Sequence, residues 1–309
     1  MARKRKGDPV HGWVNVDKPL NMTSTQVVGR VRRLFNAQKA GHAGTLDPLA
    51  SGILPIALGD ATKTVPYMMD AVKAYRVTII WGEHRDTCDA EGAVTATSDV
   101  RPTEPDVLGA LTDFIGVIDQ APPRFSAIKI DGKRAYDLAR AGEIVEMKLR
   151  KVRIDTITLT DSDSESATLE VTCGKGTYIR SLARDLARTL GTEGYVGKLR
   201  RLQVGPFIEA DSFSLDVLEE FCHTGRVLEG LRPVETALDD IPVYAATIED
   251  VKELKHGRAI VPTSEFLKSH EGIIPETVLI KHEGLAIALC RDKDGLLAPF
   301  RVFNIGSET

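Results

Sequence analysis

Residues 41–58 read GHAGTLDPLASGILPIAL, a glycine-rich stretch followed by a short apolar run. The first part shows no sustained hydrophobic period, so residues 40–52 are predicted to form a loop. The apolar run ILPIAL at 53–58 is predicted to form a short strand. Pro48 disfavours the helical conformation for Asp47 and pushes it towards an extended one. The stretch therefore predicts a carboxylate whose position is set by its backbone, on a loop that leads into a strand.

Strand and helix patterns alternate with turn signals along the rest of the chain. The segment YRVTIIW at 75–81 is β-branched and aromatic, which predicts a strand. Thr23 and Gln26 have the spacing of a capping box before a helical period. Further strands are predicted at 11–16, 151–159 and 166–173, and helices at 24–36, 103–116, 134–141 and 177–190, the last ended by Gly191. Because hairpin-like turns are frequent, the pattern predicts an α+β fold with a mixed, mostly antiparallel central sheet flanked by helices.

The distribution of charge divides the chain into two regions. The formal net charge is −4, but residues 210–309 hold 10 basic and 18 acidic residues, which leaves 30 basic and 26 acidic residues in 1–209. A polyanionic partner would therefore meet the first region. Prolines and acidic residues at 232–245 predict a domain boundary. We expect a basic flexible tail at 1–10, a main domain at 11–235 and a small β-rich domain at 236–309.

The composition argues against several classes of protein. The four cysteines stand far apart without a CxxC pair, so neither a disulfide framework nor a zinc ribbon is indicated. His84 and Cys88 are four residues apart, but no second pair completes a metal site. No apolar run approaches the roughly 18 residues that cross a bilayer, and no apolar segment of a secretory signal follows the basic N-terminus. We expect a cytoplasmic protein without a membrane segment.

Three motifs resemble those of the bacterial TruB pseudouridine synthases, in the same order and spacing over residues 11–209. They are DKPLNMTS at 17–24, GHAGTLDPLASGILPIALGDATK at 41–63 and GKGTYIRSLARDLARTLG at 174–191. The resemblance implies the pseudouridine synthase fold, followed by a small PUA-like C-terminal domain. It also implies isomerisation of uridine 55 in the T-loop of tRNA, in which the uracil is detached, turned and rejoined through C5. No cofactor, metal or protein partner is expected, and the enzyme is expected to act on the tRNA T-arm as a monomer.

The resemblance assigns three residues to the chemistry. Asp47 is the catalytic carboxylate of the GTLD motif, and Arg180 of the YIRS motif is its ion-pair partner. An opposite charge within hydrogen-bonding reach favours the ionised carboxylate. By helix spacing alone Arg180 would face solvent, since Arg184 and Arg188 follow at i+4 and i+8. Tyr75 is implied to stack on the extruded uracil and to assist removal of the C5 proton through its hydroxyl.

Other positions are implied to hold the RNA. His42 fills the space left by the flipped base, Tyr178 and Leu199 line the base pocket, and Lys63 lies near the site. RNA affinity needs phosphate contacts. The candidates for these contacts are Arg124, Lys129, Lys133, Arg134, Arg140, Lys148, Arg150, Lys151 and Arg153. The chain departs from the family at Asn21, where glycine is usual, but asparagine is the residue that next best tolerates positive φ.

Two alternatives remain open at the level of sequence. The run HAGT at 42–45 resembles a nucleotidyltransferase signature, which requires a parallel α/β sheet. CGKGT at 173–177 resembles a phosphate-binding loop but lacks the upstream glycine of that motif. The second alternative is a non-catalytic RNA-binding protein or chaperone on the same fold.

Overall fold

The structure is a computed structural model that describes residues 7–126, 128–130, 132–141, 143 and 147–305. At residues 129, 130, 133, 134, 139 and 140 only the backbone is described. The predicted tail at 1–10 therefore lies mostly outside the described residues.

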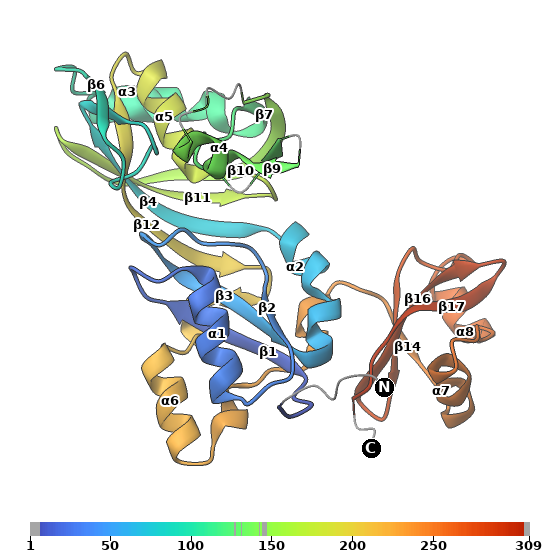
Figure 1. The fold of residues 1–309 in the computed structure, drawn as a ribbon. Helices are drawn as coiled ribbons and strands as arrows, with labels where there is room; N and C mark the ends of the chain where they lie inside the picture. The colour runs from blue at the N-terminus through green and yellow to red at the C-terminus, as the bar shows by residue number, and fades with distance from the viewer. Residues whose placement is uncertain (1–6, 127, 131, 142, 144–146, 306–309) are drawn as a thin grey trace.

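A large sheet of nine strands forms the body of the molecule (Figure 1). Its main path runs β1-β3-β12-β4-β11-β10-β7. The strands are β1 (Gly12–Lys18), β3 (Ala50–Leu58), β12 (Gly194–Val204), β4 (Lys73–Trp81), β11 (Ser166–Cys173), β10 (Arg150–Ser162) and β7 (Gly116–Gln120), with β2 (Ala40–His42) on β3 and β13 (Phe207–Ile208) on β12. Among the described pairs of this sheet, β12 with β3 is parallel and the others are antiparallel. The predicted mixed, mostly antiparallel sheet is thus confirmed.

Helices cover the two halves of this sheet separately. In Figure 1, α1 (Ser24–Leu34) and α6 (Leu215–His223) lie beside β1 and β3, whereas α3 (Glu104–Leu111) and α5 (Ile179–Thr189) lie beside β4, β11 and β10. One buried apolar cluster includes side chains from both halves, among them Val31, Leu54, Ile79 and Leu182. Thr23 caps α1 in the predicted capping box with Gln26. The core therefore extends across the sheet, and the boundary between its halves falls near β12.

Smaller helices, hairpins and turns accompany the large sheet. They are α2 (Val65–Asp70), the hairpin β5 (Glu83–Arg85) and β6 (Val94–Thr97), the hairpin β8 (Lys129–Ile130) and β9 (Lys133–Arg134), and α4 (Ala135–Arg140). Short 3-10 turns occupy 59–63, 112–114, 209–211, 227–230 and 234–238.

Three sequence expectations need correction. The helix predicted at 103–116 ends at Leu111, where a 3-10 turn at 112–114 follows, and Gly116 with φ +99° begins β7. The predicted loop at 40–52 contains β2 and the first residues of β3. The central strand β12 was not predicted, since its glycines resemble a turn. A Cβ on Gly197 would lie 2.6 Å from Ile80 Cγ1, so the glycine there permits close packing of neighbouring strands.

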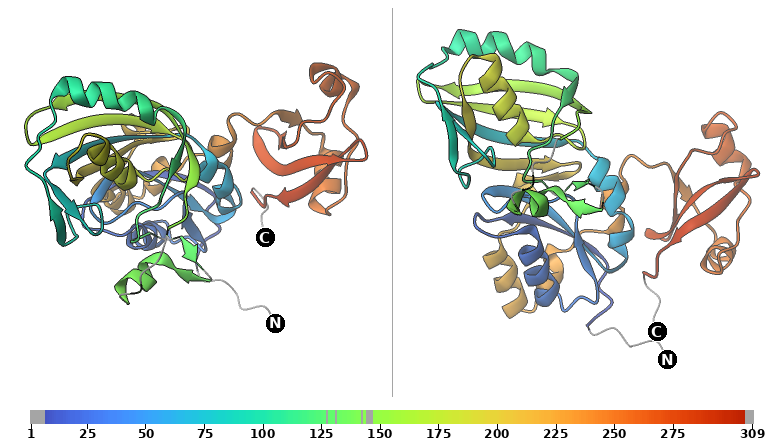
Figure 2. Two further views of the ribbon diagram at one scale, coloured as in Figure 1. Left: turned by 90° about the horizontal axis from the view of Figure 1, so that it is seen from above. Right: turned by 45° about the horizontal axis from the view of Figure 1, so that its top comes forward.

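A second sheet forms the C-terminal part of the chain (Figure 2). Its order is β14 (Val243–Ala245), β15 (Val278–His282), β16 (Leu285–Lys293) and β17 (Leu296–Val302), accompanied by α7 (Ile248–Lys255) and α8 (Ser264–Ser269). A shared apolar cluster joins Trp13 and Ile53 of the large sheet to Leu289 and Phe303. The small β-rich C-terminal domain is confirmed, while its boundary at 235/236 and its PUA-like character stay predictions.

None of the described helices is long and apolar enough to cross a membrane. Within the same residues, no group of three His, Cys, Asp or Glu side chains is placed to hold a metal ion.

Candidate active site

The loop that carries Asp47 is fixed by hydrogen bonds on both sides of the carboxylate. Ser24 Oγ accepts a hydrogen bond from Leu46 N at 2.8 Å and donates to Leu46 O at 3.0 Å, inside the protein. On the other side, Pro48 O accepts from Asn21 N at 2.8 Å. Asn21 has φ +62°, as expected for a residue that replaces glycine. The DKPLNMTS motif thus serves as a clamp for the Asp47 loop.

A buried lysine completes this clamp. Lys18 is fully buried and its ammonium donates to the carbonyls of Pro19, Met22 and Pro48 at 2.9, 2.7 and 3.4 Å. Burial lowers the pKa of Lys18 to about 8, although the negative charge of Asp47 opposes this shift. Lys18 therefore ties two loops together at an electrostatic cost.

Arg180 lies at the start of α5 and contacts two carboxylates. Its Nη2 is 3.0 Å from Asp47 Oδ2, and its Nη1 is 3.3 Å from Asp89 Oδ2. The guanidinium also donates to Thr87 O at 2.9 Å and to Phe125 O at 3.0 Å. Because four acceptors surround this buried side chain, its orientation is fixed. The ion pair expected from the resemblance is present in the structure.

The two carboxylates differ in their access to solvent. The Asp47 side chain is 41% exposed, whereas the Asp89 side chain is 10% exposed and accepts from Thr87 Oγ1 at 2.6 Å. Asp47 is therefore the carboxylate that an incoming molecule can reach. The pocket beside it is lined by Asp47, Leu49, Ala50, Asp89, Arg180, Val196, Gly197 and Leu199.

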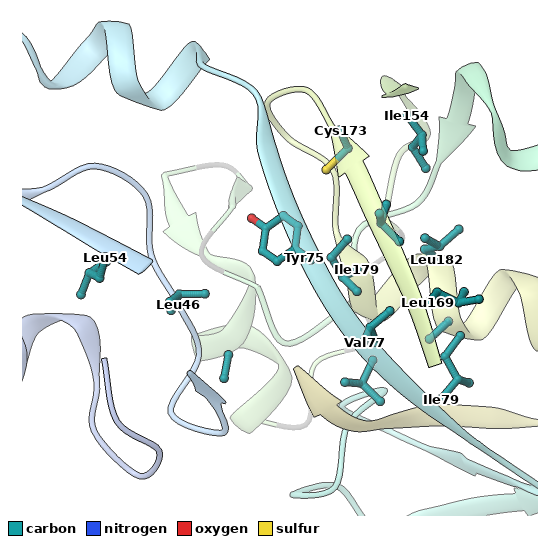
Figure 3. Packing of buried hydrophobic residues seen from close by; sticks show 14 of the residues in the cluster. Leu46, Leu54, Tyr75, Val77, Ile79, Ile154, Leu169, Cys173, Ile179 and Leu182 are labelled. Atoms are coloured by element: carbon teal, nitrogen blue, oxygen red, sulfur yellow. The ribbon is translucent and has the colours of Figure 1, made fainter. Parts of the chain in front are cut away.

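Tyr75 projects from β4 on the side of the sheet where Leu46 lies (Figure 3). Its side chain is almost fully buried. Burial raises the pKa of the Tyr75 phenol, while the positive charge of Arg201 acts in the opposite direction. Asp47 is near enough for its charge to act on the same phenol. The structure thus brings Tyr75, Asp47 and Arg180 into one neighbourhood, and their catalytic roles remain predictions.

Tyr178 and Leu199 also lie at this neighbourhood. Tyr178 directly precedes α5, and its backbone N donates to Gln120 Oε1 at 2.8 Å. Burial raises the pKa of its half-buried phenol. Leu199 of β12 lines the pocket and lies opposite Ala50 in register.

His42 belongs to β2 and is half-buried. Its Nδ1 is enclosed and has no hydrogen-bond partner among the described residues. Burial, and then the positive charge of Arg201, lower the pKa of this imidazole. His42 is therefore held in its neutral form at neutral pH.

Lys63 is not brought to the pocket. Its Nζ donates to Val302 O at 2.6 Å and pairs with Asp60 at 2.9 Å. Asp60 in turn accepts from Asn304 N at 2.6 Å. Lys63 thus connects the large sheet to the end of β17.

The predicted phosphate-binding residues receive uneven support. Arg124, Lys148, Arg150 and Lys151 are exposed, and Lys151 lies 3.8 Å from Asp119. Arg153 pairs with Asp155 at 3.0 Å. The side chains of Lys129, Lys133, Arg134 and Arg140 lie outside the described part of the chain.

Sequence reasoning missed three members of the site. Asp89 lies in an irregular turn where Cys88 has φ +60°, and no period marks that turn as functional. Arg201 follows Arg200 in a strand that was not predicted. Lys18 was part of a quoted motif but carried no assigned role. Asp89, Arg201 and Lys18 are distant from Asp47 in the sequence. Only the fold shows that they lie beside it.

The sheet also decides between the alternatives. A nucleotidyltransferase of the HAGT type needs a parallel α/β sheet, whereas β2, which ends at His42, pairs antiparallel with β3. That alternative is therefore not supported by the fold.

Comparison with known proteins gives a consistent result. Residues 32–179 match the model of the TruB family pseudouridylate synthase N-terminal domain, and residues 180–239 match that of the tRNA pseudouridylate synthase B C-terminal domain. The chain is 54% identical to tRNA pseudouridine synthase B of Caulobacter vibrioides over 99% of this chain and 100% of that protein. It is 52% identical to the enzyme of the same name in Bradyrhizobium diazoefficiens, over 98% and 91% of the two chains.

A solved H/ACA ribonucleoprotein bound to a substrate RNA containing 2'-deoxyuridine shares the fold, with a TM-score of 0.71 and 22% identity over 98% of this chain and 91% of that one. The family matches and the identity over the full length decide the assignment. The chain belongs to the tRNA pseudouridine synthase B family and is an isomerase of that class.

Proposed function

We propose that the enzyme converts uridine 55 in the T-loop of tRNA to pseudouridine, with Asp47 as its catalytic carboxylate. The observation that carries the proposal is the pair of Asp47 and Arg180. Asp47 is half-exposed at the pocket, while its partner is buried and fixed by four acceptors. In this arrangement the Asp47 carboxylate faces the substrate, and its fixed partner keeps it from rotating away.

The pocket requires the target nucleoside to leave its stack. A base inside a folded RNA loop cannot reach a carboxylate that lies among Leu49, Val196 and Leu199, so the uridine is rotated out of the loop, as in other enzymes that act on bases. In the reaction, the C1′–N1 bond breaks and a C1′–C5 bond forms. C5 then loses a proton and N1 gains one, so the product is an isomer of the substrate.

Asp47 acts in its ionised form. It either attacks C1′ or removes the C2′ proton, and both steps begin from a carboxylate. The Arg180 guanidinium lies 3.0 Å away and fixes the orientation of the carboxylate oxygens. Asp89 holds the other side of the same guanidinium and thereby positions it.

Aromatic side chains receive the extruded base. Stacking of a base on an aromatic ring contributes about 1–3 kcal/mol, which offsets much of the cost of a few kcal/mol for unstacking it. Tyr75 and Tyr178 flank the site and supply such rings. The Tyr75 hydroxyl assists removal of the C5 proton. His42, held neutral, enters the RNA loop without burying a charge.

The first region of the chain provides the electrostatic attraction for tRNA. It has 30 basic and 26 acidic residues, whereas residues 210–309 have 10 and 18. Phosphate contacts dominate the affinity for RNA and weaken with salt. The exposed Arg124, Arg150 and Lys151 are the contacts we propose within the described residues, together with Lys129 and Arg134.

The test uses unmodified tRNA transcript and a map of pseudouridine after incubation. Asp47→Asn should lower the single-turnover rate by about 10⁴-fold or more, as loss of a catalytic residue does. A transcript with cytidine at position 55 should gain no pseudouridine. The matched control is Asp70→Asn, because Asp70 is an exposed carboxylate that pairs with Lys175 outside the site.

The outcomes separate the chemical proposal from the remaining alternative. Full activity of Asp47→Asn would remove the carboxylate from the mechanism. A protein that binds the transcript but modifies no position, with or without Asp47, would be a non-catalytic RNA-binding protein.

A further inference from the structure

Arg201 is a buried cation without a carboxylate partner. Its side chain is 1% exposed, and no carboxylate in the described residues lies within ion-pair distance of its guanidinium. Its neighbour Arg200 offers the contrast, since it pairs with Asp17 at 2.9 Å and with Glu209. A buried charge without a partner destabilises a protein, and apolar residues of similar volume often replace such groups without loss. The position of Arg201 therefore calls for an explanation beyond packing.

Two backbone carbonyls from different parts of the site accept hydrogen bonds from the Arg201 guanidinium. Nε donates to Ile53 O of β3 at 2.7 Å, and Nη2 donates to Gly44 O at 3.1 Å. Gly44 lies three residues before Asp47. Tyr75 of β4 lies opposite Arg201 in the strand register, and the positive charge of Arg201 acts on its phenol. One planar group thus contacts the Asp47 loop and the tyrosine across the middle of the sheet.

The strand register makes this contact possible. Arg201 lies opposite Gly52 in β3 and opposite Tyr75 in β4. A Cβ on Gly52 would stand 2.1 Å from Arg201 O, so glycine is required for the close approach of β3. Gly44 has φ +102°, a conformation that favours glycine, and it turns its carbonyl to the guanidinium. Gly44 and Gly52 thus both allow the backbone to approach Arg201 closely.

An arginine only donates, so in a contact between the two groups the Tyr75 oxygen is the acceptor and its hydroxyl proton points away from Arg201. The positive charge also favours the deprotonated phenol, against the effect of burial. Arg201 therefore favours the form of the Tyr75 oxygen that can accept the C5 proton.

We propose that Arg201 is a positioning residue for the isomerisation, which holds the Tyr75 hydroxyl and the Gly44 end of the Asp47 loop in fixed relation to each other. The inference rests on the roles proposed above for Asp47 and Tyr75. Arg180 orients the carboxylate directly, whereas Arg201 acts through the phenol and the backbone.

The first experiment compares Arg201→Lys with Arg200→Lys. Lysine keeps the charge but has no planar fork, so it cannot reproduce the geometry in which Arg201 donates to Ile53 O and Gly44 O. With enzyme in excess over unmodified tRNA, Arg201→Lys should lower the single-turnover rate by about 100-fold, the loss expected from a small misplacement of reacting groups. Its Kd for tRNA, and both quantities for Arg200→Lys, should change by no more than about threefold.

The second experiment tests whether Arg201 acts through Tyr75. The Arg201→Lys change is repeated in a Tyr75→Phe protein, where the hydroxyl is absent. The loss of rate should be at least about tenfold smaller in that background, because residues in contact do not act additively. Equal losses in the two backgrounds, or an Arg201→Lys protein with the rate of the unaltered enzyme, would overturn the proposal. A fully active Tyr75→Phe protein would instead refute the proposed role of the hydroxyl itself.

A third measurement serves if Arg201→Lys does not fold. Tyr75→Phe leaves a buried guanidinium donor without an acceptor, which should lower Tm by at least about 3 °C. Tyr67→Phe is the control, since the half-buried Tyr67 has no side-chain hydrogen bond among the described residues. An equal Tm for the two variants would contradict the contact on which the inference depends.

Discussion

The surroundings of the pocket and the C-terminal region hold their charged side chains in different environments. Around the pocket, Lys18, Arg180 and Arg201 are all less than 10% exposed. In the C-terminal region, Arg258 and Glu253 form their ion pair with side chains that are 58% and 44% exposed. A buried charge is costly and an exposed pair contributes little. The cations around the pocket are thus held at an electrostatic cost that the exposed pair of the C-terminal region does not carry.

The strongest test of this comparison is to remove Arg180, the cation between Asp47 and Asp89. Arg180→Met keeps the side-chain volume but leaves Asp47 and Asp89 without a counter-charge. We expect the single-turnover rate to fall by roughly 10²–10³-fold, as when a fixed electrostatic group is lost, with little change in the Kd for tRNA. The stability should fall by about 3–5 kcal/mol, because the variant breaks a buried ion pair.

The two effects of Arg180→Met can be separated by a second substitution. Asp89→Asn in the same chain removes one of the stranded charges and should restore part of the stability, but not the rate. An Arg180→Met protein with an unchanged rate would show that the guanidinium has no part in catalysis.

The second prediction concerns the pH dependence of stability. Lys18 has a folded-state pKa of about 8, below its ordinary value of 10.5. Between these values the unfolded chain binds more protons than the folded one, so the contribution of Lys18 to stability increases as the pH rises. The free energy of unfolding of the enzyme, relative to that of Lys18→Met, should therefore increase with pH by at most about 3 kcal/mol across this window.

Chemical denaturation at pH 7.5, 8.5 and 9.5 would measure that shift. Lys175→Met is the matched control, because Lys175 is an exposed lysine paired with Asp70, and it should show no such trend. A constant difference between the enzyme and Lys18→Met at all three pH values would mean that Lys18 stays protonated when buried.

Much of this arrangement was predictable from sequence, and the reason differs between residues. Asp47 and Tyr75 stand in segments with local signals, a proline after the carboxylate and a β-branched strand around the tyrosine. Arg180 was found by resemblance, because its helix spacing alone places it in solvent. No local sequence pattern marks Asp89 or Arg201. The position of Arg201 depends on the register of β12 with β4, and Asp89 lies on a turn that contacts Arg180 of α5.

The third prediction tests the contact between the two sheets. Lys63→Met removes the hydrogen bond to Val302 O and the ion pair with Asp60. Loss of this partly buried hydrogen bond should lower the free energy of unfolding by about 1 kcal/mol. The isomerisation rate with saturating enzyme should stay the same. Thermal unfolding and single-turnover assays measure the two quantities.

Lys63 also has a role implied by family resemblance, which is contact with the RNA near the site. That role predicts the opposite result, a higher Kd for tRNA without loss of stability. Asp60→Asn distinguishes the two, because it disturbs the same contact between the sheets without removing a positive charge. If Lys63 joins the sheets, the two variants should resemble each other.

The smallest effect is expected at the exposed pair in the C-terminal region. Arg258 contacts Glu253 through both Nε and Nη2, and lowers the pKa of that carboxyl. Both side chains remain in water, where screening and side-chain entropy cancel most of the attraction. Glu253→Gln should therefore leave Tm, rate and Kd within experimental error at low and high salt. A loss of stability comparable to that of Arg180→Met would erase the difference between the two regions, because it would show that surface charge stabilises this fold as much as the buried pair beside the pocket.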